Sequence, residues 1–348
     1  MTNVNGRLLF LLNENVGVLF FRMSFYLVDL FTGRRTLICE MPVGKKTILA
    51  SRSRILSRLK RLEPKCIGRL SKSEFIFSLF HGVWLIDVEK KTCKKLCDNP
   101  IGFSDVINFC STESGVYWGD YGQNRGYHPV RVYCLDKKHN LRIVYSYPAG
   151  SIRHIHNIVK DSDSILIFAG DNESQAGIYR ANHDWSIVSP WKIGKQRYRA
   201  VVGFPLRGGL LYATDSVETE NHLWYIESDG TEHELTTING SCIYGSETKD
   251  YFLFSTTVES HEGGGVLRLL SNELGGGIKS KDVHIIAVNK NDLSVRIVKK
   301  YRKDIWPMKL FQYGRAQFAG GQAESTDGVW CYPIACKRIK GRSEYIKL

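Results

Sequence analysis

The pair His154 and His156 is the clearest chemical feature of this sequence. In an extended strand, alternate side chains point to one face, so the two imidazoles can reach a common point. Two imidazoles directed at one point are a frequent part of a divalent metal site. The pair is compatible with a divalent metal ion, with His128 or His261 as the expected third ligand, but two histidines alone do not define a site and no cofactor is certain from the sequence. Without a metal, the two histidines are acid–base or structural groups.

Polar residues also occupy equivalent positions in successive repeats of the chain. Counted back by about 13 to 16 residues from the end of a recurring strand, these positions hold Asp105, His156, Arg199, Tyr244 and Arg315. Two residues earlier, on the same face of each strand, lie Phe103, His154, Arg197, Cys242 and Tyr313. Because repeats place equivalent positions around one axis, we expect the first five side chains to converge on one cavity.

The arginines favour an acidic ligand, because a guanidinium pairs with a carboxylate through two parallel hydrogen bonds. The residues predicted to bind such a substrate are Arg153, Arg197, Arg199, Arg315, Tyr313, Asp120, Asp171 and Asp215. The three aspartates end strands, where this residue type also caps turns through the backbone. Both roles stay open for them.

Two reactions on an acidic sugar fit these residue types. In a lyase, an arginine or a metal neutralises a uronate carboxylate, and His156 or Tyr244 removes the acidified proton. In a hydrolase with a tyrosine nucleophile, the acid is Asp105 or Asp120. The nucleophile of that hydrolase would be one of Tyr244, Tyr313 and Tyr198. Histidines outnumber carboxylates at the inner positions, which favours the lyase, with His156, Tyr244 and Asp105 as predicted catalytic residues.

The strands that must position these residues follow one repeated pattern. Two β-rich runs enclose a turn of Asp, Asn, Gly or Lys, which is typical of a β-hairpin. The hairpins begin at Phe25, Val83, Val130, His222 and His284, with a looser copy at Gly177. Helix-like periodicity is ambiguous only in residues 48–61.

A second recurring sequence pattern, an apolar run, precedes several hairpins. Its copies end at Asp120, Asp171 and Asp215, and Thr257 takes the same position in a further copy. The aspartates are about 44 to 51 residues apart, which is the length of a four-stranded blade. We therefore predict an all-β fold, a β-propeller of six or seven four-stranded blades in a single domain, residues 1–348. The predicted blades are 7–44, 45–98, 101–149, 150–194, 195–240, 241–305 and 306–348. The last blade is expected to share strands with the N-terminal segment, so that no sheet edge stays open.

The segments that begin at Ile152, Gly177 and Tyr198 resemble the sialidase-like propellers with Asp-box (BNR) repeats. The Asp-box pattern is Ser-x-Asp-x-Gly-x-x-Trp, and Asn182, Asp184 and Trp185 echo it without the glycine and with a different spacing. The similarity covers mainly residues 100–270. It implies a propeller fold of the kind found in many glycan-active bacterial proteins.

The amino-acid composition limits the kinds of partner that the chain is expected to bind. The formal net charge is +13, and much of the basic excess lies in residues 45–72. This balance favours an acidic oligo- or polysaccharide; nucleic acid is the least favoured partner, because only charge supports it. The apolar run of residues 8–21 is interrupted by Asn13, Glu14 and Asn15, so no membrane span is predicted. Nine scattered cysteines predict reduced thiols in a cytoplasmic protein; export without a recognisable cleaved signal is the alternative.

These features predict a carbohydrate-active propeller that binds and cleaves an acidic, uronate- or sialate-like polysaccharide. A lyase is favoured over a glycoside hydrolase. No motif in the sequence is diagnostic of catalysis, so a non-catalytic propeller that binds protein or glycan remains the alternative.

Overall fold

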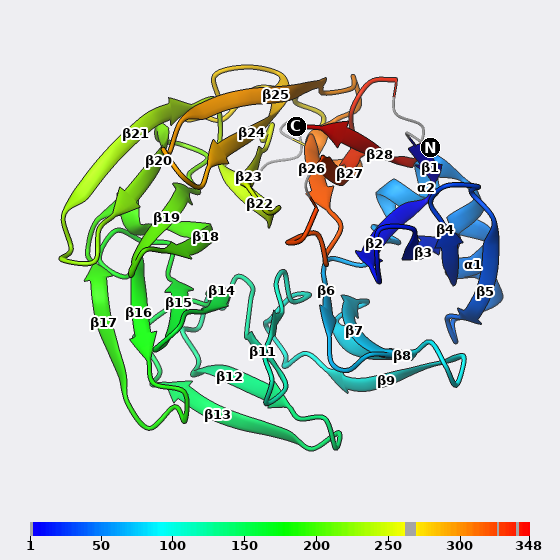
Figure 1. Ribbon diagram of the computed structural model, residues 1–348, viewed down its shortest axis with the longest axis horizontal. Helices are drawn as coiled ribbons and strands as arrows, with labels where there is room; N and C mark the ends of the chain where they lie inside the picture. The colour runs from blue at the N-terminus through cyan, green and yellow to red at the C-terminus, as the bar shows by residue number, and fades with distance from the viewer. Residues whose placement is uncertain (1–2, 262–268, 326, 339–340) are drawn as a thin grey trace. The chain divides into compact units, whose positions relative to one another are not determined.

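Within residues 3–261, 269–325, 327–338 and 341–348, which the computed structural model describes, the chain forms seven four-stranded antiparallel sheets (Figure 1). Seven such sheets are the architecture of a seven-bladed β-propeller. The predicted all-β propeller fold is therefore confirmed, and the number of blades is seven. The chain divides into two compact units. We call residues 63–201 the three-sheet unit, and residues 1–62 with 202–348 the four-sheet unit.

In the three-sheet unit, strands that are neighbours in a sheet are also neighbours in the sequence. The first sheet consists of β6 (Ile67–Arg69), β7 (Glu74–Leu79), β8 (Gly82–Asp87) and β9 (Thr92–Asp98). The second consists of β10 (Cys110–Ser111), β11 (Val116–Gly119), β12 (Val130–Leu135) and β13 (Leu141–Tyr147). The third consists of β14 (Ile155–Lys160), β15 (Ile165–Ala169), β16 (Gly177–Ala181) and β17 (Val188–Ile193).

The sheets of the four-sheet unit follow the same order, with one exception. One sheet has β2 (Arg7–Leu11), β3 (Val16–Phe21), β4 (Ser24–Asp29) and β5 (Arg35–Glu40). Another has β18 (Ala200–Leu206), whose first two residues belong to the three-sheet unit, with β19 (Gly209–Thr214), β20 (Asn221–Ile226) and β21 (Glu232–Ile238). A third has β22 (Cys242–Glu247), β23 (Tyr251–Thr256), β24 (Asp282–Asn289) and β25 (Val295–Arg302).

The exception is the sheet of β26 (Arg315–Phe318), β27 (Gly328–Ile334) and β28 (Arg342–Lys347), which the N-terminal strand β1 (Asn3–Asn5) completes (Figure 1). Val4 of β1 pairs with Ser343 of β28. The prediction that the last blade shares strands with the N-terminal segment is therefore confirmed. The pairing covers an edge of the C-terminal sheet that would otherwise expose unpaired backbone groups.

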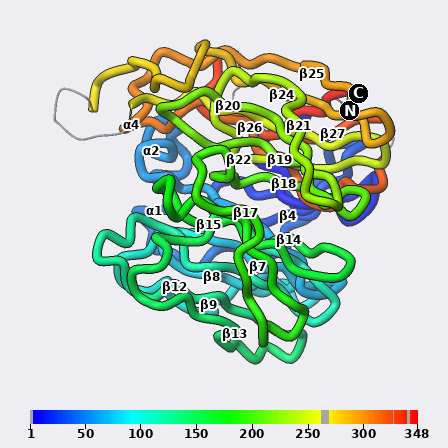
Figure 2. The backbone as a smooth tube through the Cα atoms, turned by 90° about the vertical axis from the view of Figure 1, so that its left-hand side faces the viewer, coloured from blue at the N-terminus to red at the C-terminus, as the bar shows by residue number. Residues whose placement is uncertain are grey.

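Helices are few in the described residues, and two of them overlap the segment 48–61, whose sequence pattern was ambiguous. They are α1 (Lys45–Arg52) and α2 (Arg54–Leu59); elsewhere lie α4 (Met308–Phe311) and the 3-10 helix η1 (Gln196–Tyr198). Figure 2 shows α2 beside α4, where the Arg58 Nε donates a hydrogen bond to the Phe311 carbonyl at 2.9 Å. No helix in the described residues is long and apolar enough to cross a membrane.

The hairpin of β12 and β13 shows how local sequence builds one of these sheets. Val130, Val132 and Cys134 are buried, whereas the residues between them are half-buried, as the period of two requires. The carboxylate of Asp136 then accepts hydrogen bonds from the backbone N–H groups of Lys138 (2.8 Å) and Asn140 (2.9 Å). This Asx-type turn reverses the chain where the sequence predicts a hairpin.

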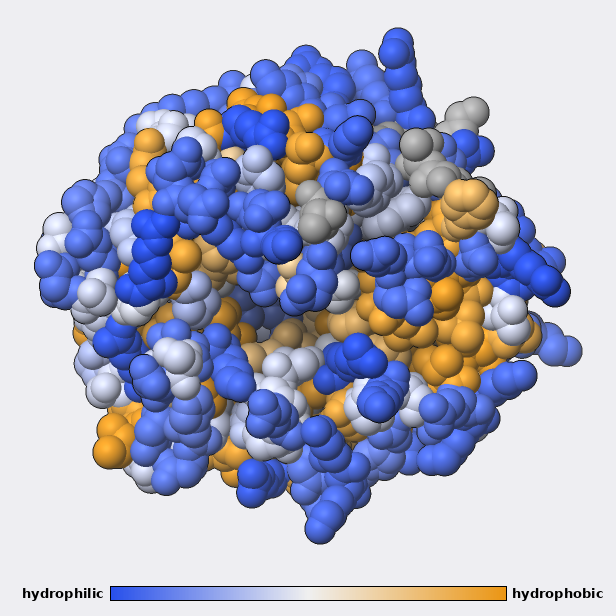
Figure 3. All heavy atoms as spheres, in the orientation of Figure 1, coloured by the Kyte–Doolittle hydropathy of each residue, from blue (hydrophilic) through white to orange (hydrophobic). Residues whose placement is uncertain are grey.

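The apolar cores lie between neighbouring sheets. In the three-sheet unit, Ile76 and Leu85 of the first sheet pack with Val116 and Trp118 of the second, and Trp118 stacks on Tyr133 at 5.6 Å. All nine cysteines are free thiols in this structure. On the face seen in Figure 3, hydrophilic side chains cover most of the surface and smaller apolar areas lie between them.

Candidate functional site

His154 directly precedes β14, His156 is the second residue of that strand, and Asp171 follows the end of the paired strand β15. Ile155 pairs with Ala169 and Asn157 with Phe168, so His156 is the extra residue of a β-bulge. Bulges bend a strand and redirect a side chain, and they are frequent beside active sites. Here the two imidazole rings stack at 4.6 Å, and both ε nitrogens face the Asp171 carboxylate.

Backbone carbonyls set the tautomer of both histidines. The Nδ1 of His154 lies 2.6 Å from the Gly122 carbonyl oxygen, and the Nδ1 of His156 lies 3.0 Å from that of Ala200. A carbonyl oxygen can only accept, so each Nδ1 carries a proton and donates it. In the neutral imidazole, the Nε2 then presents a lone pair. A backbone partner of this kind is what commonly orients a metal-binding histidine.

The two lone pairs point at a carboxylate oxygen. Asp171 Oδ1 lies 3.4 Å from the Nε2 of His154 and 3.2 Å from that of His156. Both histidines are buried, and the Nε2 of His154 makes no hydrogen bond. Acceptor facing acceptor is repulsive unless a proton or a cation lies between them. The three groups are the one set of histidine, cysteine and carboxylate side chains in the described residues whose ligand atoms gather within 4.8 Å.

The charge states follow from burial and contact. Burial lowers the pKa of His156 to about 4, despite the opposing effect of Asp171. Burial also acts to raise the pKa of Asp171, but the hydrogen bonds and positive charge that His154 and His156 supply when their Nε2 atoms are protonated outweigh it and hold that pKa far below its usual range. At neutral pH the site therefore holds an ionised carboxylate beside a neutral His156 imidazole.

Two arginines flank the same carboxylate. The Nη1 of Arg153 lies 3.4 Å from Asp171 Oδ2, and the Nη2 of Arg199 lies 3.4 Å from Asp171 Oδ1. The ring of Tyr121 packs over His154 with 4.7 Å between the ring centroids. Asp171 is thus the centre of a cluster with two imidazoles and two guanidiniums, which we call the Asp171 cluster.

The structure brings several predicted site residues together in this cluster, and it corrects the expected third ligand. His154, His156, Arg153, Arg199 and Asp171 belong to it. Asp171 stands where His128 or His261 was expected to complete the histidine pair, and that expectation is wrong. The His128 side chain is exposed, and His261, in the four-sheet unit, pairs with Glu218 at 2.7 Å.

Other predicted residues of the three-sheet unit make their contacts elsewhere. Asp105 precedes β10 and accepts a hydrogen bond from the backbone N–H of His81 at 2.7 Å. Arg197, in η1, lies over the Tyr198 ring at 5.2 Å. Asp120 is buried and accepts the backbone N–H of Arg131 at 2.9 Å, across the loop that joins β11 to β12.

Of the predicted residues in the four-sheet unit, three lie near one another: Arg315, Tyr313 and Tyr244. The Arg315 guanidinium lies over the Tyr313 ring at 4.8 Å and donates to Gln312 at 2.5 Å. Burial raises the pKa of Tyr313 well above its usual value, and the neighbouring Tyr244 adds to this. Burial lowers the pKa of Arg61, and the positive charge of Arg315 lowers it further. Asp215 is buried directly after β19.

The equivalent positions predicted from the repeats are not strictly equivalent in the sheets. His156 is the bulge residue of β14, whereas in β22 the bulge falls at Ile243 and Tyr244 pairs with Ser255. A bulge shifts the register by one residue, so counting residues alone misaligns the two strands. The convergence of Asp105, His156, Arg199, Tyr244 and Arg315 on one cavity stays a prediction.

Residue-type reasoning did not identify two partners. Asp171 was predicted to bind substrate, but no spacing in the sequence pairs it with the histidines, because β-sheet pairing creates that contact. Arg61 was noted only as part of a basic segment, although it lies near Arg315, Tyr313 and Tyr244. The signal available for Asp171 was its place at the end of a strand next to the histidine strand.

The buried Asp120 yields a pH-dependence prediction. Burial raises its pKa from 3.8 to about 6. The unfolded chain therefore loses this proton first as pH rises, and the folded state loses stability between about pH 4 and pH 6. At neutral pH the cost is about 3 kcal/mol, since one pKa unit corresponds to about 1.4 kcal/mol. Asp120→Asn should remove this loss, which unfolding free energies measured at pH 4, 5, 6 and 7 will show.

The control for that experiment is Asp136→Asn. Hydrogen bonds from Asn140 lower the pKa of Asp136, so its contribution to stability grows with pH. As pH rises, the stability of wild type relative to the variant should thus fall for Asp120→Asn and rise for Asp136→Asn. Identical pH profiles for wild type and Asp120→Asn would contradict the interpretation.

No protein-family model matches the chain, and no curated protein matches it in sequence. Solved structures with a similar fold include an oligogalacturonate lyase in complex with manganese, at a TM-score of 0.56 and 9% identity, covering 100% of this chain and 90% of that chain. An oligogalacturonate lyase from Vibrio parahaemolyticus has a TM-score of 0.53 and 8% identity, and the match covers 99% of this chain and 90% of that chain. A chain of the mitotic checkpoint complex has a TM-score of 0.57 and 9% identity, and the match covers 99% of this chain and 89% of that chain.

At such identities the likeness shows the fold alone, a seven-bladed β-propeller, and these relatives serve different functions on it. No family model supports the resemblance to Asp-box propellers. The echo of that motif forms the turn between β16 and β17, where Asp184 accepts the backbone N–H of Ser186 at 2.9 Å.

Proposed function

We propose that this protein binds an acidic oligosaccharide and cleaves it by β-elimination, at a divalent metal ion held by His154, His156 and Asp171. The observation that carries the proposal is the arrangement of two buried Nε2 lone pairs around one carboxylate oxygen, at 3.4 and 3.2 Å. Three ligands at about 2.1 Å from one ion stand about 3.0 to 3.4 Å apart in octahedral or tetrahedral geometry. The ligand atoms therefore need little movement to share an ion.

The donor set limits the choice of metal. Two imidazoles and one carboxylate suit Zn²⁺, Mn²⁺ or Fe²⁺, and they leave coordination positions for a substrate. The oligogalacturonate lyase of similar fold is a manganese complex, so Mn²⁺ is the first ion to test. The metal and the two arginines carry more positive charge than the one Asp171 carboxylate offsets. This excess favours a substrate rich in carboxylates.

The roles of the residues follow from their positions. A bound divalent ion would withdraw electrons from a uronate carboxylate and acidify the C5–H bond next to it. Arg153 and Arg199 would pair with the same or a neighbouring carboxylate and fix its orientation. His156 cannot also be the base if its Nε2 binds the metal, because its Nδ1 already donates to Ala200. The contacts within the three-sheet unit then assign no base to this site, and Tyr244, the other base that the sequence predicts, belongs to the four-sheet unit.

The elimination is balanced within the substrate. The base takes the C5 proton, the electron pair of that bond forms the C4=C5 double bond, and the C4–O bond breaks. The departing oxygen takes up a proton from a residue or from water. The reaction needs no oxidant or reductant.

The test is incubation of the full chain with trigalacturonate and Mn²⁺. We expect ultraviolet absorbance to rise, because the new double bond is conjugated with the carboxylate. Methyl-esterified galacturonan is the control substrate, since it lacks the carboxylate charge. New reducing ends without absorbance would indicate hydrolysis and contradict the elimination. Binding of trigalacturonate without either signal would leave the non-catalytic propeller as the function.

A further inference from the structure

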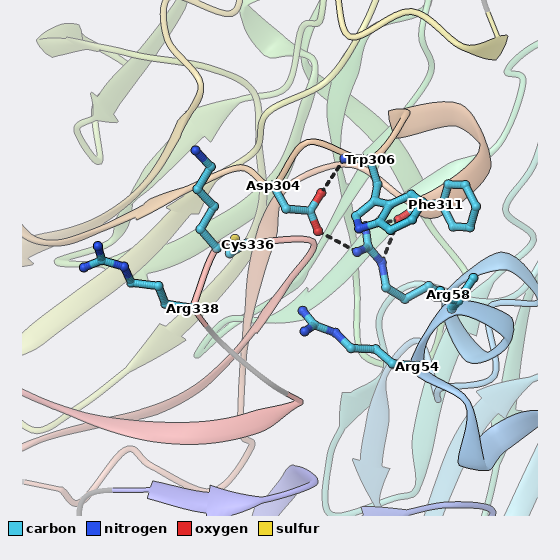
Figure 4. A pocket seen from close by; sticks show the side chains of 9 residues that line it. Arg54, Arg58, Asp304, Trp306, Phe311, Cys336 and Arg338 are labelled. Carbon is cyan, nitrogen blue, oxygen red and sulfur yellow. Dashed lines mark hydrogen bonds and ion pairs between the residues drawn. The ribbon is translucent and has the colours of Figure 1, made fainter.

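A pocket of about 360 Å³ lies in the four-sheet unit, far along the chain from the Asp171 cluster residues. Three segments line it: α2, the residues that follow β25, and the residues that follow β27 (Figure 4). Its charged and aromatic lining includes Arg54, Arg58, Lys337, Arg338, Asp304 and Trp306. We call it the Trp306 pocket.

The lining is strongly cationic. Four of these side chains are basic, and Asp304 is the one carboxylate among the described lining residues. Asp304 already pairs with Arg58 at 2.5 Å and with the buried Lys303 at 2.6 Å (Figure 4 shows the Arg58 contact). It therefore does not offset the charges of Lys337 and Arg338. A pocket with such an excess attracts an anion of two or more negative charges.

Apolar surface lies next to this charge. Trp306 is 41% exposed, although its ring packs against Phe311 at 5.0 Å. Ile55, another lining residue, is 48% exposed. An indole held at the wall of a basic pocket offers a flat face on which a ring can stack, beside cations for a charged group.

The wall that carries Trp306 is held in place before any ligand arrives. The Nζ of buried Lys303 donates to the carbonyl oxygens of Asp304 at 3.1 Å and Trp306 at 2.8 Å, as well as to the Asp304 carboxylate. The Arg58 Nε also donates to the Phe311 carbonyl at 2.9 Å. Such preorganisation lowers the entropy cost of binding.

We propose that the Trp306 pocket binds a small phosphate-bearing molecule with a planar ring. Arginine guanidiniums from α2 and from the segment after β27 match the oxygens of a phosphate or diphosphate group. Trp306 and Ile55 would contact the ring. The described lining residues of this pocket include no histidine and no carboxylate other than Asp304, so it is not a second copy of the Asp171 cluster.

The experiment is calorimetric titration of the full chain, without added metal, with two probes: pyrophosphate and adenosine 5′-diphosphate. We expect both to bind, and the nucleotide to bind at least about fivefold tighter because its ring contacts Trp306. Arg54→Ala/Arg338→Ala should weaken both probes by at least tenfold. Trp306→Ala should weaken the nucleotide and leave pyrophosphate nearly unchanged.

The matched control is Arg34→Ala/Lys300→Ala, which removes two exposed charges outside the pocket and should bind both probes as wild type does. Thermal unfolding of each variant shows whether it is folded. Failure of both probes to bind wild type at millimolar concentration would overturn the proposal. So would equal weakening in the pocket and control variants, which indicates general charge attraction. Binding of trigalacturonate in this pocket, lost in Arg54→Ala/Arg338→Ala, would overturn the assigned ligand class.

Discussion

Asp171→Asn is expected to weaken Mn²⁺ binding by at least about 100-fold and to abolish turnover of trigalacturonate. The change removes the charged oxygen that lies 3.4 and 3.2 Å from the two Nε2 atoms. Loss of an outer-shell partner costs about 10- to 100-fold in metal affinity, so loss of a ligand should cost more. His154→Ala and His156→Ala should have the same effect. Titration of the metal-free protein with Mn²⁺, followed by elemental analysis, measures it.

The matched control for this prediction is His183→Ala. His183 belongs to the same unit, and its ring lies 3.3 Å from the Ser162 carbonyl oxygen, away from the Asp171 cluster. Its loss should leave metal binding unchanged. Asp171 also contacts two arginines, so Asp171→Asn needs a thermal unfolding measurement, whereas His154→Ala spares those contacts. Stoichiometric metal in His154→Ala, or none in the wild type, would mean that the cluster is a structural network.

Arg199→Lys is expected to weaken trigalacturonate binding by at least tenfold, about 1.4 kcal/mol, while Mn²⁺ binding is retained. Lysine keeps the charge but cannot present two parallel donors to a carboxylate. Arg199 lies beside Asp171, 3.4 Å from its Oδ1, where a substrate carboxylate would meet it together with Arg153. Calorimetric titration of the metal-loaded protein with trigalacturonate measures the change.

The control is Arg142→Lys, at an exposed position of β13. It should bind trigalacturonate as wild type does. If Arg199→Ala binds trigalacturonate within about threefold of wild type, a difference of about 0.7 kcal/mol, Arg199 does not contribute to an anion site. Retained Mn²⁺ binding in Arg199→Lys separates this failure from a failure of the metal site.

The hairpins could be predicted because their causes are local. The alternation of Val130, Val132 and Cys134 and the turn carboxylate of Asp136 lie within ten or so residues. The helices α1 and α2 were less clear, because four apolar side chains of this segment stay exposed: Leu49, Ile55, Leu56 and Leu59. A helix without a continuous buried face shows weak periodicity.

The candidate site could be predicted in part. The sequence placed His154 and His156 on one strand face, and it selected Arg153, Arg199 and Asp171 as polar residues near strand ends. It could not identify Asp171 as the partner of the histidines, because the pairing of β14 with β15 brings them together. The bulge at His156 also escapes prediction, since no residue type specifies it.

The sequence by itself determined which segments become strands, how many blades they form within the range of six or seven, and which side chains can carry charge or bind a metal. Period-two alternation and turn chemistry act over a few residues, so they can be recognised without long-range contacts. Only the tertiary structure decided that Asp171 completes the histidine pair and that the Nδ1 atoms donate to Gly122 and Ala200. Those carbonyls lie more than 30 residues away along the chain from their histidines. Backbone groups are the same in every residue, so their position in a site appears only when the strands pack.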